Sequence, residues 1–224
     1  MHEFAEDFQD SPTLKAIQQQ CSQYKMYAIG SIPRRQNEKF YNTAFVINPD
    51  GLLQEQFDKL HLFDIDIPGK ITYKESETFT QGSKVCVFNT EYCKMGLAIC
   101  YDLRFAELGL LMRQKGASVL LYPGSFNQTT GPLHWELLLR ARALDNQCYA
   151  VGVSVAQFKE DPTIYQAWAH STIVDPFGKV LVALDENPAI AYYDIDPNYV
   201  NEVREQIPIS KQKRHDIYRL EEVQ

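Results

Sequence analysis

A single cysteine ends a short apolar stretch of the chain, in the sequence GLAICYDLRF at residues 96–105. The apolar run predicts a buried strand, and Cys100 stands at its carboxyl end, before a helix that begins near Arg104. In open α/β sheets, binding sites form beyond the carboxyl ends of strands. A helix N-terminus beside a thiol favours the nucleophilic thiolate. The position of Cys100 therefore indicates a nucleophile, although a small packed thiol has the same sequence signature.

A nucleophilic thiol needs a base for its proton and donors for the oxyanion that forms at an attacked carbonyl. Histidine is the usual base, but His61, His134 and His170 do not lie in a sequence context typical of cysteine proteases. A carboxylate base with a lysine is a second arrangement, in which the ammonium stabilises both thiolate and oxyanion. The residue types alone leave both arrangements open.

The elements that must position these groups follow from apolar periodicity and turn residues. Helices are expected over residues 11–24, 105–116, 134–147 and 199–207. Strands are expected at residues 26–32, 84–90, 94–102, 118–124, 149–156 and 189–196, with strand pairs about turns within 42–62 and 169–184. Strands alternating with helices and mixed with hairpins indicate an α/β protein with mixed sheets. No boundary divides the chain, so one domain over residues 1–224 is expected.

The composition excludes several classes of partner. The 224 residues carry a net charge of −7 and no long basic run, which argues against nucleic acid and anionic membranes as partners. No apolar run approaches the ~18 residues of a transmembrane helix, and the acidic first residues do not resemble a signal peptide. The five cysteines form no Cys-x-x-Cys pair, so a reducing cytoplasmic location is expected.

Three of the cysteines are evenly spaced, at Cys86, Cys93 and Cys100. Zinc sites favour ligand pairs two to four residues apart. We therefore expect no metal site, and ordinary buried thiols at Cys21, Cys86 and Cys148.

Several long motifs resemble the nitrilase superfamily of carbon-nitrogen hydrolases, and in particular its omega-amidase branch. They are DKLHLFDIDIPGKITYKES, GLAICYDLRFAEL, YPGSFNQTTGPLHWELLLRARALDNQ, AHSTIVDPFG and IPISKQKRHDIY, and they are spread over nearly the whole chain. The resemblance implies a four-layer α-β-β-α sandwich, assembly into a homodimer through helical faces, and catalysis without a metal or organic cofactor.

The resemblance also assigns catalytic roles by motif. Cys100 in ICYD is the nucleophile, Lys59 before LHLFD is the catalytic lysine, and Glu75 in ITYKES is a supporting glutamate. The backbone N–H of Tyr101 joins the lysine as oxyanion donor. Without the resemblance, Lys59 would be interpreted as an exposed strand-end lysine and Glu75 as a loop carboxylate.

Two further residues are candidates for binding the substrate, a small amide. The branch acts on short dicarboxylate monoamides, and the Arg104 guanidinium suits bidentate binding of the free carboxylate. A salt bridge with Glu107 or Asp102 is its alternative. Phe126 follows the next strand and is expected either to wall the pocket or to pack in the core.

Other polar residues receive structural roles. Glu136 precedes Arg140 by four residues, which is the spacing of a helix-surface ion pair. His134, Asp145 and Asn146 are expected to support the fold or a subunit contact, and His170 is expected to be a structural histidine with its hydrogen bonds satisfied.

One part of the family's pattern is expected to be missing. The general-base glutamate normally follows an opening strand and helix, and SPTLKAIQQQCSQY resembles the second helix of the family. The sequence therefore predicts a fold without that first strand and helix. Glu3 and Glu6 are the nearest substitutes in order, but no preceding strand holds them in place. We expect weak or absent turnover, because a general base typically contributes about 10²–10⁴-fold.

The expected activity is hydrolysis of the C–N bond of a short omega-monoamide of a dicarboxylic or 2-oxo-dicarboxylic acid, through a Cys100 thioester. Two alternatives remain open on sequence. The first is a non-catalytic homologue that binds a small carboxylate or a partner subunit. The second is a Cys-His hydrolase that uses His134 or His170.

Overall fold

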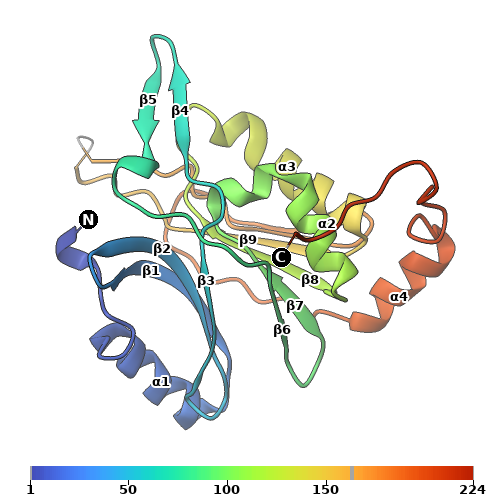
Figure 1. The fold of residues 1–224 in the computed structure, drawn as a ribbon, viewed down its shortest axis with the longest axis horizontal. Coiled ribbons are helices and arrows are strands. Elements are labelled where there is room, and N and C mark those ends of the chain that lie inside the picture. The colour runs from blue at the N-terminus through green and yellow to red at the C-terminus, as the bar shows by residue number, and fades with distance from the viewer. Residues whose placement is uncertain (1, 162–163, 224) are drawn as a thin grey trace. The chain divides into compact units, whose positions relative to one another are not determined.

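The computed structural model describes residues 2–161 and 164–223. The chain divides into two compact units, Met1–Cys86 and Val87–Gln224, and both combine strands with helices (Figure 1). The single domain expected over residues 1–224 stays a prediction.

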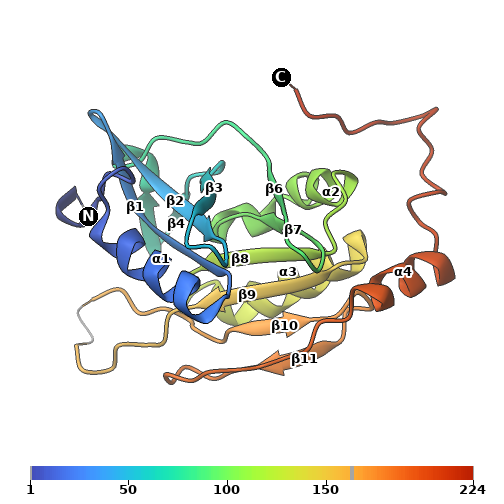
Figure 2. The same cartoon turned by 90° about the horizontal axis from the view of Figure 1, so that it is seen from below.

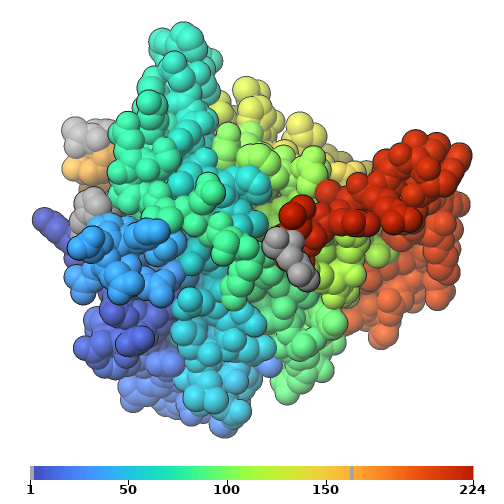
Figure 3. Space-filling model, in the orientation of Figure 1, coloured from blue at the N-terminus to red at the C-terminus, as the bar shows by residue number. Residues whose placement is uncertain are grey.

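Unit 1 is built on an antiparallel sheet of three strands in the order β1-β2-β3 and on a separate two-stranded hairpin of β4 and β5. Its described elements are η1 (His2–Phe4), α1 (Pro12–Tyr24), β1 (Ala28–Gln36), β2 (Lys39–Ile47), β3 (Leu53–Asp58), β4 (Asp64–Ile67), β5 (Ile71–Lys74) and η2 (Glu75–Glu77). The β4–β5 hairpin stands out at the surface of this unit (Figure 3).

Helix α1 has the start and stop signals expected from its sequence. The Ser11 hydroxyl accepts the Leu14 N–H at 2.9 Å, and Pro12 occupies the first turn, where no N–H is needed. The helix ends at Lys25 in the left-handed region. Its apolar side chains pack on the sheet in a core of Leu14, Cys21, Phe45 and Ile47, which holds α1 beside β1 and β2.

Unit 2 is built on a mixed six-stranded sheet in the order β11-β10-β9-β8-β7-β6. Its elements are β6 (Cys86–Asn89), β7 (Lys94–Leu97), η3 (Cys100–Arg104), α2 (Ala106–Gln114), β8 (Val119–Gly124), α3 (Gly131–Asn146), β9 (Tyr149–Ser154), β10 (Thr172–Val174), β11 (Val180–Ala183) and α4 (Pro197–Gln206). Strands β7, β8 and β9 are parallel neighbours, whereas β9, β10 and β11 pair antiparallel. The segments that follow β7, β8 and β9 therefore leave the sheet at one shared edge.

Three helices cover parts of this sheet. Helices α2 and α3 contact one another and pack on β7 and β9 respectively. Helix α4 packs where β8 and β9 begin, through a core of Val119, Tyr149 and Val200 (Figure 2). Across residues 2–161 and 164–223, no helix combines the length and apolarity needed to cross a membrane.

Most expected elements are present, within a few residues of the expected bounds. The hairpin about Asp-Pro-Phe-Gly is confirmed, and the Asp175 carboxylate stabilises its turn by accepting the N–H groups of Phe177 and Lys179. The strand expected at residues 189–196 is wrong, because this segment has no regular structure. Tyr192 of this segment is 86% exposed, whereas Ile195 packs on the core of Val119, Tyr149 and Val200.

Candidate active site

Cys100 occupies a sharp turn between β7 and α2, as the first residue of η3. Its φ of 47° is in the left-handed region, which residues other than glycine seldom adopt. The carboxylate of the buried Asp102 folds back on the turn and accepts the Ile99 N–H at 3.0 Å. The turn thus presents the thiol at the carboxyl edge of the sheet, as the sequence predicts for a nucleophile.

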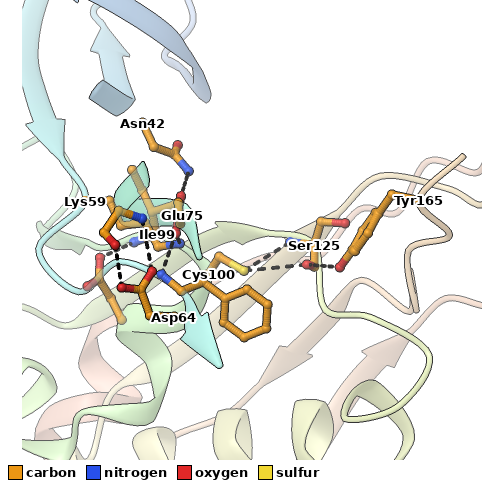
Figure 4. A network of polar contacts seen from close by, with 11 residues as sticks. Asn42, Lys59, Asp64, Glu75, Ile99, Cys100, Ser125 and Tyr165 are labelled. Carbon is orange, nitrogen blue, oxygen red and sulfur yellow. Dashed lines mark hydrogen bonds and ion pairs between the residues drawn. The ribbon is translucent and has the colours of Figure 1, made fainter. Parts of the chain in front are cut away.

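The segment after β8 lies directly against this turn. A Cβ on Gly124 would be 2.8 Å from the Cys100 Cα, so only glycine permits the close approach of the two backbones. The next residue, Ser125, donates its N–H to the Cys100 Sγ at 3.4 Å (Figure 4). Donation to sulfur favours the thiolate over the thiol. Neither Gly124 nor Ser125 is a sequence-predicted site residue.

A buried arginine of α3 anchors the segment that follows Cys100. The Arg142 guanidinium donates to the carbonyl oxygens of Leu103 at 2.9 Å and Arg104 at 3.0 Å. These carbonyls lie at the end of η3, where helical partners are lacking. Arg142 therefore holds η3 on α3, a role with no local signature in the sequence.

Arg104 lies beside the aromatic rings of its neighbours. Its Cζ is 4.8 Å from the centre of the Phe126 ring and 5.6 Å from that of Tyr101. Its Nη1 lies 3.1 Å from His134 Nδ1. Burial, followed by the charge of Arg104, lowers the pKa of His134, so its neutral imidazole can accept this hydrogen bond.

The alternative of a salt bridge from Arg104 is wrong. Among the described residues, no carboxylate forms an ion pair with this guanidinium, and Asp102 instead turns toward the Ile99 N–H. Burial lowers the pKa of Arg104 from its ordinary value, but arginine stays charged at neutral pH. A guanidinium suits the bidentate binding of a carboxylate, and the binding of a substrate by Arg104 stays a prediction.

Phe126 is 5% exposed and packs edge-to-face on Trp135, with ring centres 5.0 Å apart. It therefore belongs to the core of unit 2 while one face supports Arg104. A role in lining a substrate pocket stays a prediction.

Unit 1 contains a second polar cluster, at the ends of β3 and β5. Lys59 follows β3 and Glu75 follows β5, and Lys59 Nζ donates to Glu75 Oε2 at 2.5 Å (Figure 4). Glu75 also accepts from Asn42 Nδ2 at 3.0 Å and from the Phe63 N–H at 2.6 Å. Lys59 is 3% exposed and Glu75 is 4% exposed.

The interpretation of these two residues as an exposed lysine and a loop carboxylate is therefore wrong. Three donors converge on one buried carboxylate, and its ion pair with Lys59 Nζ fixes the position of the lysine. The structure thus brings Lys59 together with Glu75 in unit 1, and Cys100 together with Tyr101, Arg104 and Phe126 in unit 2.

The acidic residues considered as substitute bases have different surroundings. Glu3 is exposed. Glu6 caps α1, where its carboxylate accepts the Thr13 N–H at 3.2 Å and the hydroxyls of Thr13 and Ser11. Burial alone would raise the pKa of Glu6, but these hydrogen bonds outweigh it and the pKa is lowered. A carboxylate stabilised in its ionised form is a poor proton acceptor.

His134 and His170 form hydrogen bonds away from Cys100. His134 bonds to Arg104, while His170 bonds through Nδ1 to the Trp168 carbonyl and stacks on its ring. Within the described residues, neither forms a hydrogen bond with Cys100. This arrangement supports structural roles for both.

The other residues given structural roles are found in supporting contacts. Glu136 and Arg140 form the expected exposed pair at 3.7 Å. Asp145 pairs with Arg142 at 3.6 Å, and Asn146 Nδ2 donates to the Arg142 carbonyl at 2.9 Å.

Cysteines other than Cys100 are poor nucleophiles. Cys21, Cys86 and Cys148 are buried, as predicted. Burial raises the pKa of the Cys86 and Cys148 thiols to about 11. Over the described part of the chain, no three His, Cys, Asp or Glu side chains gather as a metal site would require.

Comparison with known proteins shows that the chain is similar to carbon-nitrogen hydrolases. The family model described as carbon-nitrogen hydrolase matches residues 1–205. Omega-amidase NIT2 of Xenopus tropicalis is 50% identical over 222 residues, which cover 98% of this chain and 79% of that protein. Omega-amidase NIT2 of Homo sapiens is 48% identical over 221 residues, with the same coverage of 98% and 79%.

Solved structures share the fold. The Saccharomyces cerevisiae Nit3 structure, from branch 10 of the nitrilase superfamily, matches with a TM-score of 0.85 at 36% identity, over 95% of this chain and 76% of that one. The C. elegans NitFhit protein matches with a TM-score of 0.87 at 35% identity, over 94% of this chain and 52% of that one. The α/β fold of this superfamily, expected from the sequence, is confirmed.

Proposed function

The chain belongs to the carbon-nitrogen hydrolase family, and from that premise we propose that it hydrolyses the terminal amide of short dicarboxylic monoamides, 2-oxo acids among them. The products are the free acid and ammonia. The observation that carries the proposal is the left-handed turn that presents Cys100 with a backbone N–H aimed at its sulfur. The omega-amidase names of relatives at 50% and 48% identity support the substrate class.

The proposed reaction has two stages. The Cys100 thiolate attacks the amide carbon, an S–C bond forms, and the carbonyl electron pair moves onto oxygen. Lys59 and the Tyr101 N–H stabilise this oxyanion. Its collapse breaks the C–N bond, and the nitrogen leaves as ammonia after gaining a proton. Water then attacks the thioester, releases the acid and restores the thiol.

Glu75 supports this reaction indirectly. Its carboxylate binds Lys59 Nζ in a buried setting, so the lysine is held in one orientation. A fixed cation stabilises a developing oxyanion better than a mobile one, because no reorganisation is needed during the reaction.

Arg104 provides the preference for an acidic substrate in this proposal. Its guanidinium is half-buried, supported by Phe126, and forms no ion pair with a described carboxylate. A substrate carboxylate can therefore take up its free donors without displacing an internal partner.

The first test is ammonia release from succinamate by the purified protein and by Cys100→Ala. Release that depends on Cys100 supports the proposal, and Glu3→Gln and Glu6→Gln then show whether either residue transfers the proton. No release from a folded protein contradicts it and favours a non-catalytic homologue that binds a small carboxylate or a partner subunit.

We also propose that the protein is a homodimer located in the cytoplasm. The described cysteines are all free thiols, which suits a reducing compartment. For the dimer, support comes from leucines exposed along α3, at Leu133, Leu137 and Leu144.

A further inference from the structure

Three loops meet at the carboxyl edge of the sheet in unit 2. The loop after β7 carries Cys100, the loop after β8 carries Ser125, and the loop after β9 carries Tyr165. The Tyr165 hydroxyl donates to the Ser125 carbonyl oxygen at 2.8 Å, and the Ser125 N–H donates to Cys100 Sγ at 3.4 Å (Figure 4). A tyrosine of a distant loop is therefore connected to the thiol through one residue.

The loop that carries Tyr165 is anchored next to that tyrosine. Ala167 forms an antiparallel bridge with Asn127, and the Trp168 N–H donates to the Phe126 carbonyl at 2.6 Å. The Gln128 side chain donates to the Ala167 carbonyl at 2.6 Å. Because these bonds fix residues 167 and 168 on the segment after Ser125, the Tyr165 hydroxyl has a defined position over that segment.

The carbonyl oxygen of Ser125 opposes the effect of the Ser125 N–H, which stabilises the Cys100 thiolate. Its oxygen lies 3.7 Å from Cys100 Sγ, where a protonated thiol can donate to it. A carbonyl oxygen beside sulfur stabilises the thiol and repels the thiolate, since both carry negative charge. A hydroxyl that donates to the same oxygen withdraws part of this charge and holds the Ser125 backbone in place.

We propose that Tyr165 is a positioning residue for the nucleophile, whose hydroxyl neutralises and fixes the Ser125 carbonyl so that the Ser125 N–H can stabilise the Cys100 thiolate. This role rests on the proposed function, in which Cys100 is the attacking group. Tyr165 acts through the Ser125 backbone in this arrangement.

The test is the pH dependence of Cys100 alkylation by iodoacetamide, followed by mass spectrometry of the Cys100 peptide between pH 5 and pH 10. In Tyr165→Phe, the midpoint of the rate profile moves to higher pH by about half a unit, which is about threefold in rate below the midpoint. The shift is small because the Tyr165 side chain is 55% exposed, and water replaces part of the lost bond. The plateau rate at high pH stays unchanged.

Tyr192→Phe is the matched control, because it removes the same oxygen from a tyrosine that is 86% exposed. The inference is overturned if Tyr165→Phe and Tyr192→Phe both give the profile of the unaltered protein. It is also overturned if Tyr165→Phe changes only the plateau rate, which would indicate access to the thiol rather than thiolate stability. Ammonia release by the unaltered protein is measured separately, so failure of the proposed function is distinguished from failure of this role.

Discussion

At the scale of single residues, the Lys59–Glu75 pair shows how burial changes the contribution of an ion pair to the free energy of unfolding. Exposed ion pairs contribute about 0–1 kcal/mol, but a buried charge that loses its partner costs about 3–5 kcal/mol. Both side chains are nearly inaccessible to water, and three donors converge on the carboxylate. The pair therefore couples stability to the position of Lys59, the lysine of the proposed reaction.

Removing both partners should cost less than the sum of the two single removals. We expect Lys59→Met or Glu75→Leu to lower the free energy of unfolding by about 3–5 kcal/mol, and the double variant to lose less than the sum. Urea unfolding of the four proteins measures the coupling. The exposed Lys84–Glu55 pair at 3.3 Å is the control, and Lys84→Met should cost less than about 1 kcal/mol. Additive losses at Lys59 and Glu75 would contradict the coupling.

Arg104 should discriminate between acidic and neutral amides. We expect Arg104→Met to lower kcat/KM for succinamate by about 10–100-fold, since a charge-assisted bond to a carboxylate is lost. Butyramide, which has the same chain length without the acid, should be affected far less. Arg140→Met changes an exposed arginine of α3 and serves as control. Equal losses on the two amides would remove the carboxylate-binding role.

At the scale of elements, the conformation of the turn at Cys100 depends on how closely the end of β8 approaches it. We expect Gly124→Ala to lower the Cys100 alkylation rate at least about tenfold and stability by about 1–3 kcal/mol, because the new methyl group meets backbone 2.8 Å away. Alkylation kinetics and urea unfolding measure the two effects.

Gly69→Ala separates backbone strain from this clash. Gly69 has a φ of +72° with nothing within 4 Å of an added Cβ, so we expect a loss of about 1 kcal/mol from strain alone and an unchanged alkylation rate. A normal alkylation rate in Gly124→Ala would show that the turn does not need the close approach.

The cap of α1 should make stability depend on pH. The folded-state pKa of Glu6 is lowered, so its contribution is present above the ordinary pKa and is lost as pH falls through the folded value. We expect Glu6→Gln to lower stability by about 1 kcal/mol at pH 7 and to equal the unaltered protein at pH 3. Urea unfolding at both values tests this, with the exposed Glu3→Gln as control. A difference that persists at pH 3 would contradict the assignment.

Local signals predicted elements well but long-range contacts poorly. Ser11 and Pro12 predict the start of α1, and Asp175 predicts the turn between β10 and β11, because each acts on residues only a few positions away. The contacts of Arg142 with η3 and of Tyr165 with Ser125 join positions 38–40 residues apart. No residue type or spacing predicts these contacts, because they depend on which strands are neighbours in the sheet. The exposed tyrosines near residue 192 likewise resemble a strand in composition, but no strand of the described part of the chain pairs with them.

At the scale of the whole molecule, α3 carries exposed apolar side chains that unit 2 does not cover. Leu133, Leu137 and Leu144 are 69%, 64% and 52% exposed, at spacings that place them on one face of the helix. The Arg140 Nε donates to the Gly178 carbonyl at 3.0 Å beside this face, where Phe177 is also exposed. Exposed leucines grouped on one helix face are typical of an interface between subunits.

The dimer should therefore depend on α3. We expect the unaltered protein to sediment as a dimer, and Leu137→Glu to sediment as a monomer with an unchanged circular dichroism spectrum, because burying an unpaired carboxylate at an interface is unfavourable. Leu52→Glu places the same charge on a residue of unit 1 that is 61% exposed, and this variant should remain dimeric.

A monomeric unaltered protein would refute the homodimer, and a dimeric Leu137→Glu would show that the interface does not involve α3. If the monomer retains amidase activity, each subunit carries a complete set of catalytic residues, whereas loss of activity on dissociation would mean that assembly supports the site.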